Sequence, residues 1–326
     1  MQIPPKYQIT SEILELISKI EALKIYFSSI EISPERKEKI RRVSTLKSSL
    51  FSAKIEGNPL LLGEIENTSR EKEKKEVFNI LDAIKYIEKL EAKKVTKKQI
   101  LVLHELVMKG LSNDIGRFRN TPEAIFNESG VAIEVFPSAM NITDLLNGLL
   151  KYLNSSKEKF ILIKAFIGHL VFEKIHPFID GNGRVGRLLI NLILKSGSFD
   201  FNLVVPFEEY IEGHKKEYYF YLDEGFKKPE GYLLFMLKGF LEKADELRKE
   251  LLTKEPDDLL LPPRREEILK IIKEHQTVTF DFIRRRFLAI PGRTLRYDLK
   301  KLLEKGFIVK IGKTNKSYYR FRQNVG

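Results

Sequence analysis

Two apolar helical patterns joined by a short glycine-containing segment constrain the fold of this chain more than any other feature. From Phe160 to Ile175, apolar side chains recur at helical spacing, and the pattern stops at His176-Pro177 because proline disfavours helical geometry in the residue before it. A second helical pattern begins just after Gly181 and carries Leu188, Leu189, Leu192 and Ile193. The sequence therefore predicts two helices with a short loop between them.

The neighbouring sequence is also mostly helical, for example at Ser44–Asn58 and Glu76–Leu90. The exception is Arg117–Pro137, where the β-branched run Val131–Val135 follows the turn-like residues Asn127–Gly130. This pattern predicts a β-hairpin or an extended flap. We therefore expect a mainly α fold with a small β-hairpin.

The composition excludes several classes of site. The chain of 326 residues has no cysteine, so disulfides, thiolate metal sites and cysteine nucleophiles are excluded. The amino-terminal residues MQIPPKYQIT lack an apolar core, so we expect no signal peptide. The longest apolar stretches, such as the one around Leu192, are much shorter than a membrane span. We expect a cytoplasmic protein that does not bind membranes.

Nearly all the excess positive charge lies near the carboxyl terminus. Residues 262–326 contain 17 Lys and Arg against 6 Asp and Glu, whereas residues 1–261 contain 40 and 39. A polyanionic partner is therefore expected to bind the tail. The segment 246–261 is charged and then acidic, and Pro262-Pro263 follows it, which is typical of a linker.

The loop between the two central helices has the residues of an anion site. Gly181 and Gly183 let the backbone bend sharply and turn N–H groups outward, and the helix that follows adds the partial positive charge of its N-terminus. Arg184 and Arg187 lie three residues apart on one helix face, which suits a polyphosphate. Asp180 offers a hard oxygen ligand for Mg²⁺ beside those phosphates.

Other interpretations of this segment exist. Gly181-x-Gly-x-x-Gly186 also matches the dinucleotide-binding fingerprint, but that motif requires a preceding strand, and the preceding pattern here is helical. His169, His176 and Asp180 could form a metal site, but no third nitrogen or further carboxylate stands at a familiar spacing. We interpret His169 as a structural histidine that faces the core.

The segment His176-Pro-Phe-Ile-Asp-Gly-Asn-Gly-Arg-Val-Gly-Arg187 resembles the signature loop of the Fic family, whose pattern H-x-F-x-[DE]-G-N-G-R-x-x-R it meets at every specified position. The resemblance extends over about Ser44–Tyr221. It implies transfer of AMP from ATP with Mg²⁺ to a protein hydroxyl on Ser, Thr or Tyr, with His176 as general base. It further implies that the phosphates are bound by Asn182, Arg184 and Arg187. A loop that has lost its activity is the alternative.

Upstream, Ser52-Ala-Lys-Ile-Glu56-Gly57 resembles the inhibitory motif of the same family, [S/T]-x-x-x-E-[G/N]. The resemblance implies that Glu56 pairs with Arg187, bidentately, and so blocks the site of the γ-phosphate. Some relatives use this glutamate to remove AMP by hydrolysis, so de-AMPylation is a further possibility. The alternative for so short a motif is an ordinary solvated glutamate on a helix.

Two other segments correspond to features of the family. Arg117–Pro137 corresponds to the flap that docks the target main chain, and an ordinary surface hairpin is the alternative. Tyr210–Tyr219 resembles the segment beside the adenine, which implies contacts from His214, Tyr218 and Tyr219. Relatives often have Asn in place of His214, and Tyr218 and Tyr219 could instead belong to the core.

The basic tail has the pattern of a winged helix-turn-helix domain. Arg264–His275, Thr279–Phe287 and Arg293–Lys305 are predicted helices, and Phe307–Ile311 with Ser317–Phe321 form a predicted hairpin. Leu295, Leu299, Leu302 and Leu303 are expected in its core. The candidate DNA contacts are Arg293, Arg296, Tyr297, Lys300, Lys313 and Lys316. The same fold also serves as a protein-docking module.

The sequence thus predicts four parts: an N-terminal helical region with an inhibitory helix (1–95), a Fic catalytic core (96–245), a linker (246–261) and a winged helix domain (262–326). The expected function is protein adenylylation, with the protein itself as one candidate target and a homodimer as one candidate assembly. The rival hypothesis is a DNA-binding regulator whose Fic domain senses nucleotide without transferring it.

Overall fold

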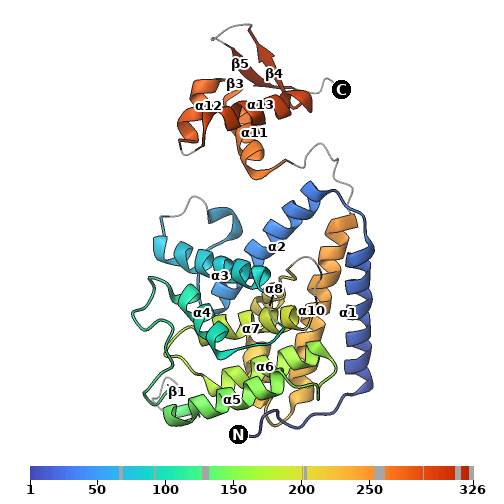
Figure 1. Cartoon of the computed structure of the whole chain (residues 1–326), viewed down its shortest axis with the longest axis vertical. Helices are drawn as coiled ribbons and strands as arrows, with labels where there is room; N and C mark the ends of the chain where they lie inside the picture. The colour runs from blue at the N-terminus through green and yellow to red at the C-terminus, as the bar shows by residue number, and fades with distance from the viewer. Residues whose placement is uncertain are drawn as a thin grey trace. The chain divides into compact units, whose positions relative to one another are not determined.

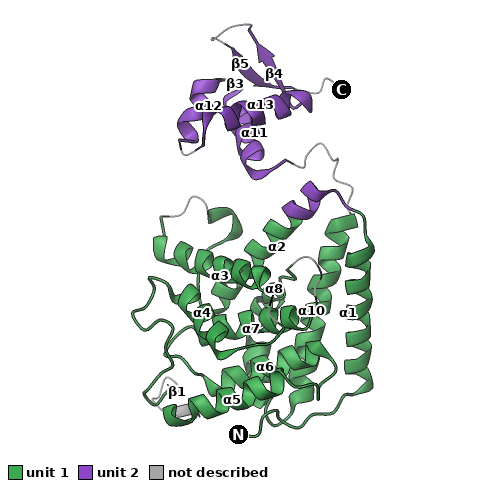
Figure 2. Cartoon of the chain, viewed as in Figure 1, with its two compact units in different colours: residues 1–31, 40–252 green, residues 32–39, 253–326 purple. Residues whose placement is uncertain are grey.

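The chain folds into two compact units in a computed structural model, one formed by residues 1–31 and 40–252 and the other by residues 32–39 and 253–326 (Figure 2). The structure describes residues 1–65, 69–91, 93–126, 132–199, 201, 204–252, 261–288, 290–312 and 317–322. The division expected at residue 95 lies inside the first unit. The second division falls at the end of a long helix, which continues to Leu252 through the first part of the predicted linker.

The first unit is helical except for one hairpin (Figure 1). Its elements are α1 (Ser11–Ser29), α2 (Pro34–Ile55), η1 (Leu62–Glu64), α3 (Glu71–Lys89), α4 (Lys97–Met108), β1 (Ala124–Phe126), β2 (Ala132–Val135), η2 (Ala139–Asn141), α5 (Ile142–Leu153), α6 (Ile161–Ile175), α7 (Asn182–Ser196), α8 (Glu208–Gly213), α9 (Lys215–Glu224) and α10 (Pro229–Leu252).

Helices α6 and α7 are the two predicted around the loop, and they form the centre of this unit. Helix α6 is apolar on all sides, so it must be covered all round, and it packs against α5, α7 and α10. The side chains expected in its core are all buried, namely Ile163, Phe166, Ile167, Leu170 and Val171. Gly168 lets α5 and α7 approach α6 closely, because a Cβ there would lie 2.7 Å from Leu153 Cδ2 and 2.9 Å from Ile193 Cδ1.

Helix α2 begins ten residues earlier than the sequence pattern indicates and ends at Ile55. Pro34 stands at its first position, where a missing N–H costs nothing, and Ser33 Oγ accepts a hydrogen bond of 3.3 Å from the backbone N–H of Arg36. The first turns have no apolar stripe, which explains why the pattern began only at Ser44. Further on, the helix buries a row of small polar side chains: Ser44, Ser48, Ser49 and Ser52.

The predicted flap contains an antiparallel hairpin, in which Ala124 lies opposite Val135 and Ile125 lies opposite Glu134. The pairing shifts register between Ile125 and Phe126. The turn residues 127–131, including the turn-like segment on which the prediction rested, lie outside the described residues.

The second unit contains α11 (Pro263–His275), β3 (Thr277–Thr279), α12 (Phe280–Arg286), α13 (Gly292–Glu304), β4 (Ile308–Ile311) and β5 (Tyr318–Phe321). The three helices and the hairpin agree with the predicted ranges, whereas β3 was not predicted because it has only three residues. The sheet has the order β3-β5-β4 and is antiparallel. Leu295, Leu299 and Leu302 are buried in its core as expected, and Leu303 packs against it.

Among the residues that the structure describes, no helix combines the length and apolar character needed to cross a membrane.

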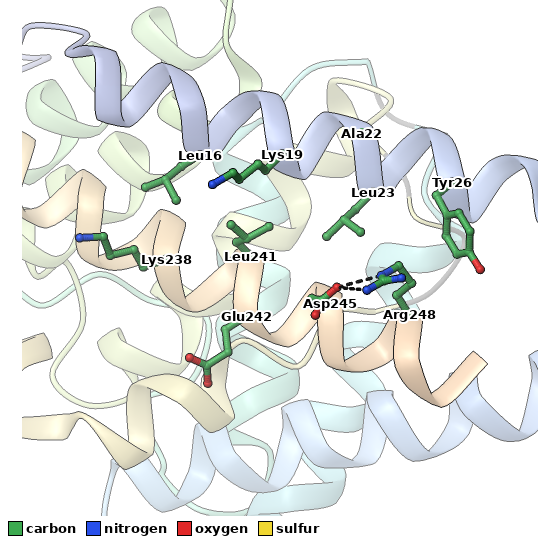
Figure 3. A pocket seen from close by; sticks show the side chains of 10 residues that line it. All are labelled: Leu16, Lys19, Ala22, Leu23, Tyr26, Lys238, Leu241, Glu242, Asp245 and Arg248. Atoms are coloured by element: carbon green, nitrogen blue, oxygen red, sulfur yellow. Dashed lines mark hydrogen bonds and ion pairs between the residues drawn. The ribbon is translucent and has the colours of Figure 1, made fainter. Parts of the chain in front are cut away.

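A groove of about 640 Å³ lies between α1 and α10 (Figure 3). Its lining includes Leu16, Leu23 and Leu241, and the ion pair of Asp245 and Arg248 lies at one end. None of its lining residues belongs to the segment between α6 and α7.

We predict that Gly168→Val destabilises the protein by about 1–3 kcal/mol, because the added side chain overpacks the contact of α6 with Leu153 and Ile193. Denaturant unfolding followed by circular dichroism measures this. Gly213→Val is the matched control, since a Cβ at Gly213 meets nothing within 4 Å. Equal stability of the two variants would contradict the close packing described here.

Candidate active site

His176 ends α6 in an unusual backbone conformation. Its φ of 49° and ψ of 62° lie in the left-handed region, which costs energy for a side chain other than glycine. The strain turns the chain sharply into Pro177, which a helical residue could not precede without strain. The imidazole stacks on Phe136 with ring centroids 3.9 Å apart, and its Nδ1 lies 3.3 Å from the backbone oxygen of Glu173. The ring is therefore held between α6 and the segment that follows the flap.

Asn182 closes the loop on itself. Its Oδ1 accepts a hydrogen bond of 2.9 Å from the backbone N–H of Phe178, and its Nδ2 donates one of 2.7 Å to the Phe178 oxygen. The side chain is 2% exposed. Both polar atoms of this side chain thus bind the loop backbone, so Asn182 shapes the loop, and its backbone N–H lies at the start of α7. The phosphate contact expected of Asn182 stays a prediction, for which this backbone N–H is the available group.

His104 on α4 is a second loop anchor, which the sequence analysis missed. Its ring lies parallel to Phe178 with centroids 3.8 Å apart, and its Nδ1 accepts a hydrogen bond of 2.9 Å from the N–H of Gly116. Its Nε2 therefore carries the proton and donates to the backbone oxygen of Asp180 at 3.0 Å. Burial lowers the pKa of His104, so the ring is neutral and keeps this tautomer. No local motif marks His104, since it precedes the loop by more than seventy residues.

The two loop glycines leave room for neighbouring side chains, and the conformation of Gly181 favours glycine. Gly181 has a φ of 83°, which favours glycine, and a Cβ there would lie 2.8 Å from Met108 Sδ. At Gly183 a Cβ would lie 2.4 Å from Glu56 Oε1. A carboxylate oxygen thus lies directly against the first turn of α7, where the free backbone N–H groups and the helix dipole favour an anion.

Arg184 and Arg187 both carry buried charge at this helix end. The Arg184 side chain is 7% exposed, with Nη1 donating to Glu76 Oε1 at 2.6 Å and Nη2 to Asp180 Oδ1 at 2.7 Å. Glu76 on α3 is a further residue that the sequence analysis missed, because it is separated from Arg184 by 108 positions and lies in no motif.

Arg187 is 1% exposed. Among the described residues, the hydrogen bonds of its side chain all go to Ser52 and Glu56, at the end of α2. Its Nε donates to Ser52 Oγ at 3.0 Å, and its Nη2 donates to the Ser52 oxygen and to Glu56 Oε1, both at 2.8 Å. The expected contact with Glu56 is thus present, but it is a single hydrogen bond and not a bidentate pair, and Ser52 binds the Nε side of the guanidinium. Gly57, with a φ of 99°, follows Glu56 in the turn after α2.

Asp180 fits the predicted role of a magnesium ligand by its exposure and chemistry. Its side chain is 63% exposed, and one oxygen, Oδ1, serves the N–H of Gly181 and the guanidinium of Arg184. The carboxylate thus stands at the rim of the anion site with a fixed orientation. Hard carboxylate oxygens of this kind bind Mg²⁺ together with substrate phosphates.

The residues expected beside the adenine have different locations. Tyr218 is 1% exposed and forms a hydrogen bond of 2.8 Å with Nε2 of the buried His169, which favours the core position given above as its alternative, and His169 is a core residue as predicted. Tyr219 is 45% exposed, and the charges of Glu56 and Arg187 act on it, which places it near the loop. His214 stacks on Tyr210 with centroids 4.1 Å apart.

Arg119 fastens the flap to the loop and was also missed by the sequence analysis. Its guanidinium is buried and donates to four backbone oxygens, those of His176 (2.7 Å), Thr121 (2.9 Å), Pro137 (2.6 Å) and Ile175 (3.5 Å). Its own backbone N–H donates to the oxygen of Pro177 at 2.9 Å. One side chain therefore joins both ends of the flap to the residue expected to act as base. The Arg117–Pro137 pattern indicated a hairpin but not this clamp.

The candidate nucleic-acid surface lies on α13. Arg293, Arg296, Tyr297 and Lys300 are all exposed, whereas Lys313 and Lys316 lie outside the described residues. Arg296 stacks over the ring of Phe280 at 4.3 Å, and the buried Asp298 on the opposite face binds Arg264 and Arg265. The helix therefore presents its basic side chains outward.

Comparison with known proteins agrees with this helical loop site. Residues 94–194 match the family model described as the Fic/DOC family. A probable protein adenylyltransferase of Aquifex aeolicus is 29% identical over 157 residues, which cover 46% of this chain and 48% of that protein. The protein adenylyltransferase Fic of Drosophila mojavensis is 25% identical over 235 residues, which cover 66% of this chain and 44% of that protein. The chain thus spans about half the length of these curated relatives.

Solved structures share the fold. A Fic family protein from Desulfovibrio desulfuricans has a TM-score of 0.68 at 24% identity, with 100% of this chain and 99% of that chain covered. Fic-1 from C. elegans has a TM-score of 0.63 at 21% identity, with 74% of each chain covered. The helical arrangement around the loop is therefore one that known Fic proteins also adopt.

We predict that Asn182→Ala destabilises the protein by about 2–4 kcal/mol, because it leaves the buried N–H and C=O of Phe178 without partners. Urea unfolding measures the free energy. Asn191→Ala on the same helix is the control, since Asn191 Nδ2 has no hydrogen-bond partner and its loss should cost much less. A larger loss for Asn191→Ala would overturn the assigned role of Asn182.

Proposed function

We propose that the chain transfers AMP from ATP to a hydroxyl of a protein. The observation that carries the proposal is the convergence of an imidazole, a helix N-terminus and two buried arginines on one loop. The curated relatives named as adenylyltransferases support it at modest identity. Backbone N–H groups at the start of α7 and the guanidinium groups of Arg184 and Arg187 would bind the phosphates.

His176 would act as the base. Burial lowers its pKa to about 4, so the imidazole is neutral at pH 7 and can accept a proton. Since its Nδ1 lies against the backbone oxygen of Glu173, Nε2 is the nitrogen left for the target hydroxyl. As Nε2 takes the proton, the hydroxyl oxygen forms its bond to the α-phosphorus, the bond to the bridging oxygen breaks, and pyrophosphate leaves. A positioned base supplies ~10²–10⁴-fold in rate.

The nucleotide would be held by residues that already bear charge. A magnesium ion bound with the nucleotide would neutralise phosphate charge, and Asp180 is the residue that would bind the ion. Arg184 and Arg187 contribute positive charge in a site with little water, where such charge acts strongly on the phosphates. The geometry thus suits positioning and charge stabilisation more than any covalent step by the protein.

Glu56 would inhibit this activity. Its carboxylate lies against Gly183 and binds Arg187, so it occupies the position that phosphate oxygens need. A charge-assisted hydrogen bond of ~1.5–3 kcal/mol corresponds to a loss of about 10–100-fold in productive nucleotide binding. Ser52 would support the inhibition by holding the other edge of the Arg187 guanidinium.

We predict that Glu56→Gly raises covalent labelling from α-labelled ATP by about 10–100-fold, because it frees Arg187 and the N-terminus of α7. The double variant Glu56→Gly, His176→Ala should incorporate no label. Scintillation counting of the precipitated protein after incubation with ATP and Mg²⁺ gives the result.

Equal labelling of the wild type and Glu56→Gly would dismiss the inhibition. Reversible binding of ATP without covalent label in either protein would instead support a nucleotide sensor. Transfer requires the His176 base, whereas sensing requires only the anion site.

The second unit supports an additional candidate function, binding of DNA through a winged helix. Its elements follow the order helix, strand, two helices and hairpin, and α13 presents Arg293, Arg296, Tyr297 and Lys300 to solvent. We propose that α13 binds the major groove, since a recognition helix needs exposed basic and polar side chains there. Protein docking by the same surface is the alternative.

We predict that the full chain binds duplex DNA with an affinity that falls steeply with salt, and that the double variant Arg293→Ala, Lys300→Ala reduces the slope of log K against log salt by about 2. A mobility-shift assay over a salt series tests this. Lys270→Ala, on the exposed face of α11, is the control for the loss of a basic charge. Absence of binding at low salt would exclude the proposal.

A further inference from the structure

Glu123, at the entrance to the flap, lies against the side chain that we propose as the base. Its Oε1 is 3.6 Å from Nε2 of His176, and its side chain is 25% exposed. This nitrogen is the one left free by the contact of Nδ1 with Glu173. The carboxylate therefore stands where the proton of a target hydroxyl must arrive. Nothing in the sequence motifs marks Glu123.

Arg119 fixes the position of this carboxylate. Its Nε is 3.3 Å from Glu123 Oε2 and donates its short hydrogen bond of 2.7 Å to the backbone oxygen of His176. The guanidinium is thus supplied with backbone acceptors and does not need Glu123 for hydrogen bonding. Conversely, Glu123 Oε2 is buried and has no hydrogen-bond partner.

A buried carboxylate oxygen without a hydrogen bond costs stability, so a purely structural role explains it poorly. Burial raises the pKa of Glu123, and Arg119 opposes that effect. The arrangement of imidazole, carboxylate and guanidinium has the order found where a carboxylate orients a catalytic histidine and stabilises its protonated form. Here the carboxylate meets Nε2 rather than Nδ1, so it meets the proton directly after transfer.

We propose that Glu123 is a positioning residue for His176: held by Arg119, it keeps Nε2 directed toward the flap and stabilises the proton that Nε2 takes from the target hydroxyl. The proposal rests on the proposed AMP transfer. When the oxygen of the target bonds to the α-phosphorus, its proton passes to Nε2, and the imidazolium forms an ion pair with Glu123 until the proton returns to solvent. The groups that face His176 are Glu123 and Arg119 from the flap, Glu56 from the end of α2, and Asp180 from the loop.

The first test measures His176 directly and does not require activity. The chain has five histidines, and the Cε1–H signal of His176 in a ¹³C-histidine sample is the one missing from His176→Ala. Spectra are recorded from pH 8 downward without added divalent cations. We expect the protonation midpoint of His176 to be lower in Glu123→Gln than in the wild type, since an opposite charge near Nε2 favours the charged form.

The matched control is Glu105→Gln, which removes the same charge from an exposed position on α4 and should leave the midpoint unchanged. An unchanged midpoint in Glu123→Gln would show that Glu123 is only the counter-ion of Arg119 and would overturn the proposal. If Glu123→Gln does not fold, Glu123→Asp replaces it, because the shorter side chain keeps the charge near Arg119 but withdraws it from Nε2. The protonation midpoint of His176 in Glu123→Asp should then lie below that in the wild type.

The second test measures transfer in the Glu56→Gly background. We expect Glu123→Gln to lower the single-turnover rate by about 10–100-fold with the affinity for ATP unchanged, because Glu123 contacts none of the phosphate-binding residues. The pH at which the remaining rate reaches half its maximum should be lower than in the parent, in step with the lower protonation midpoint of His176, and Glu123→Asp should restore part of the rate. A parallel loss of ATP affinity, or an unchanged pH profile, would contradict the proposal. Absence of transfer in the parent would refute the proposed function and leave the first test valid.

Discussion

The buried guanidinium of Arg187 is the constraint on which the site depends. A charge that is 1% exposed must be paired, because an unpaired buried charge costs several kcal/mol. In this structure the partners are Ser52 and Glu56, which belong to a helix far away in sequence. A bound triphosphate would offer the same guanidinium a different set of oxygens. The position of α2 and the binding of nucleotide are therefore linked through one side chain that cannot stay unpaired.

The loop next to Arg187 owes its shape to side chains that bind its backbone. Asn182 bonds to Phe178, His104 to Asp180 and Arg119 to His176, so the carbonyl groups of a sharply bent segment are satisfied without water. The N–H groups at the start of α7 are left without intrahelical partners, as in any helix, and Glu56 lies against this turn at Gly183. The order of the loop and its capacity for anions thus have one cause. Side chains donate hydrogen bonds to the carbonyl oxygens of the loop, and the backbone N–H groups at the start of α7 remain available for an anion.

Sequence alone predicted the parts of this arrangement that are local. The helical periodicity around the loop predicted α6 and α7, and the glycines predicted the bend between them. The leucines of α13 predicted part of the core of the second unit. Contacts between distant segments left no pattern. Glu76 and Arg184 are 108 positions apart, and Arg119 and His176 are 57 apart, so nothing in their neighbourhoods signals the pairing. The side chains of Asn182 and Tyr218 have polar groups that suit a ligand but form hydrogen bonds inside the protein, which their types and positions in the sequence do not show.

Because α2 is largely polar, its hydrogen bonds with Arg187 contribute to holding it in place. The helix buries four serines, which contribute little hydrophobic stabilisation. Its lysines reach α8 only through long ion pairs, Lys47 with Glu209 at 3.9 Å and Lys54 with Glu212 at 3.5 Å. Such partly exposed pairs contribute little. The bonds from Arg187 to Ser52 and Glu56 therefore add directional contacts to the burial of Leu50, Ala53 and Ile55 at the end of α2. Because nucleotide would compete for the same guanidinium, the interaction that blocks the site is also one that holds the blocking helix, and loss of one weakens the other.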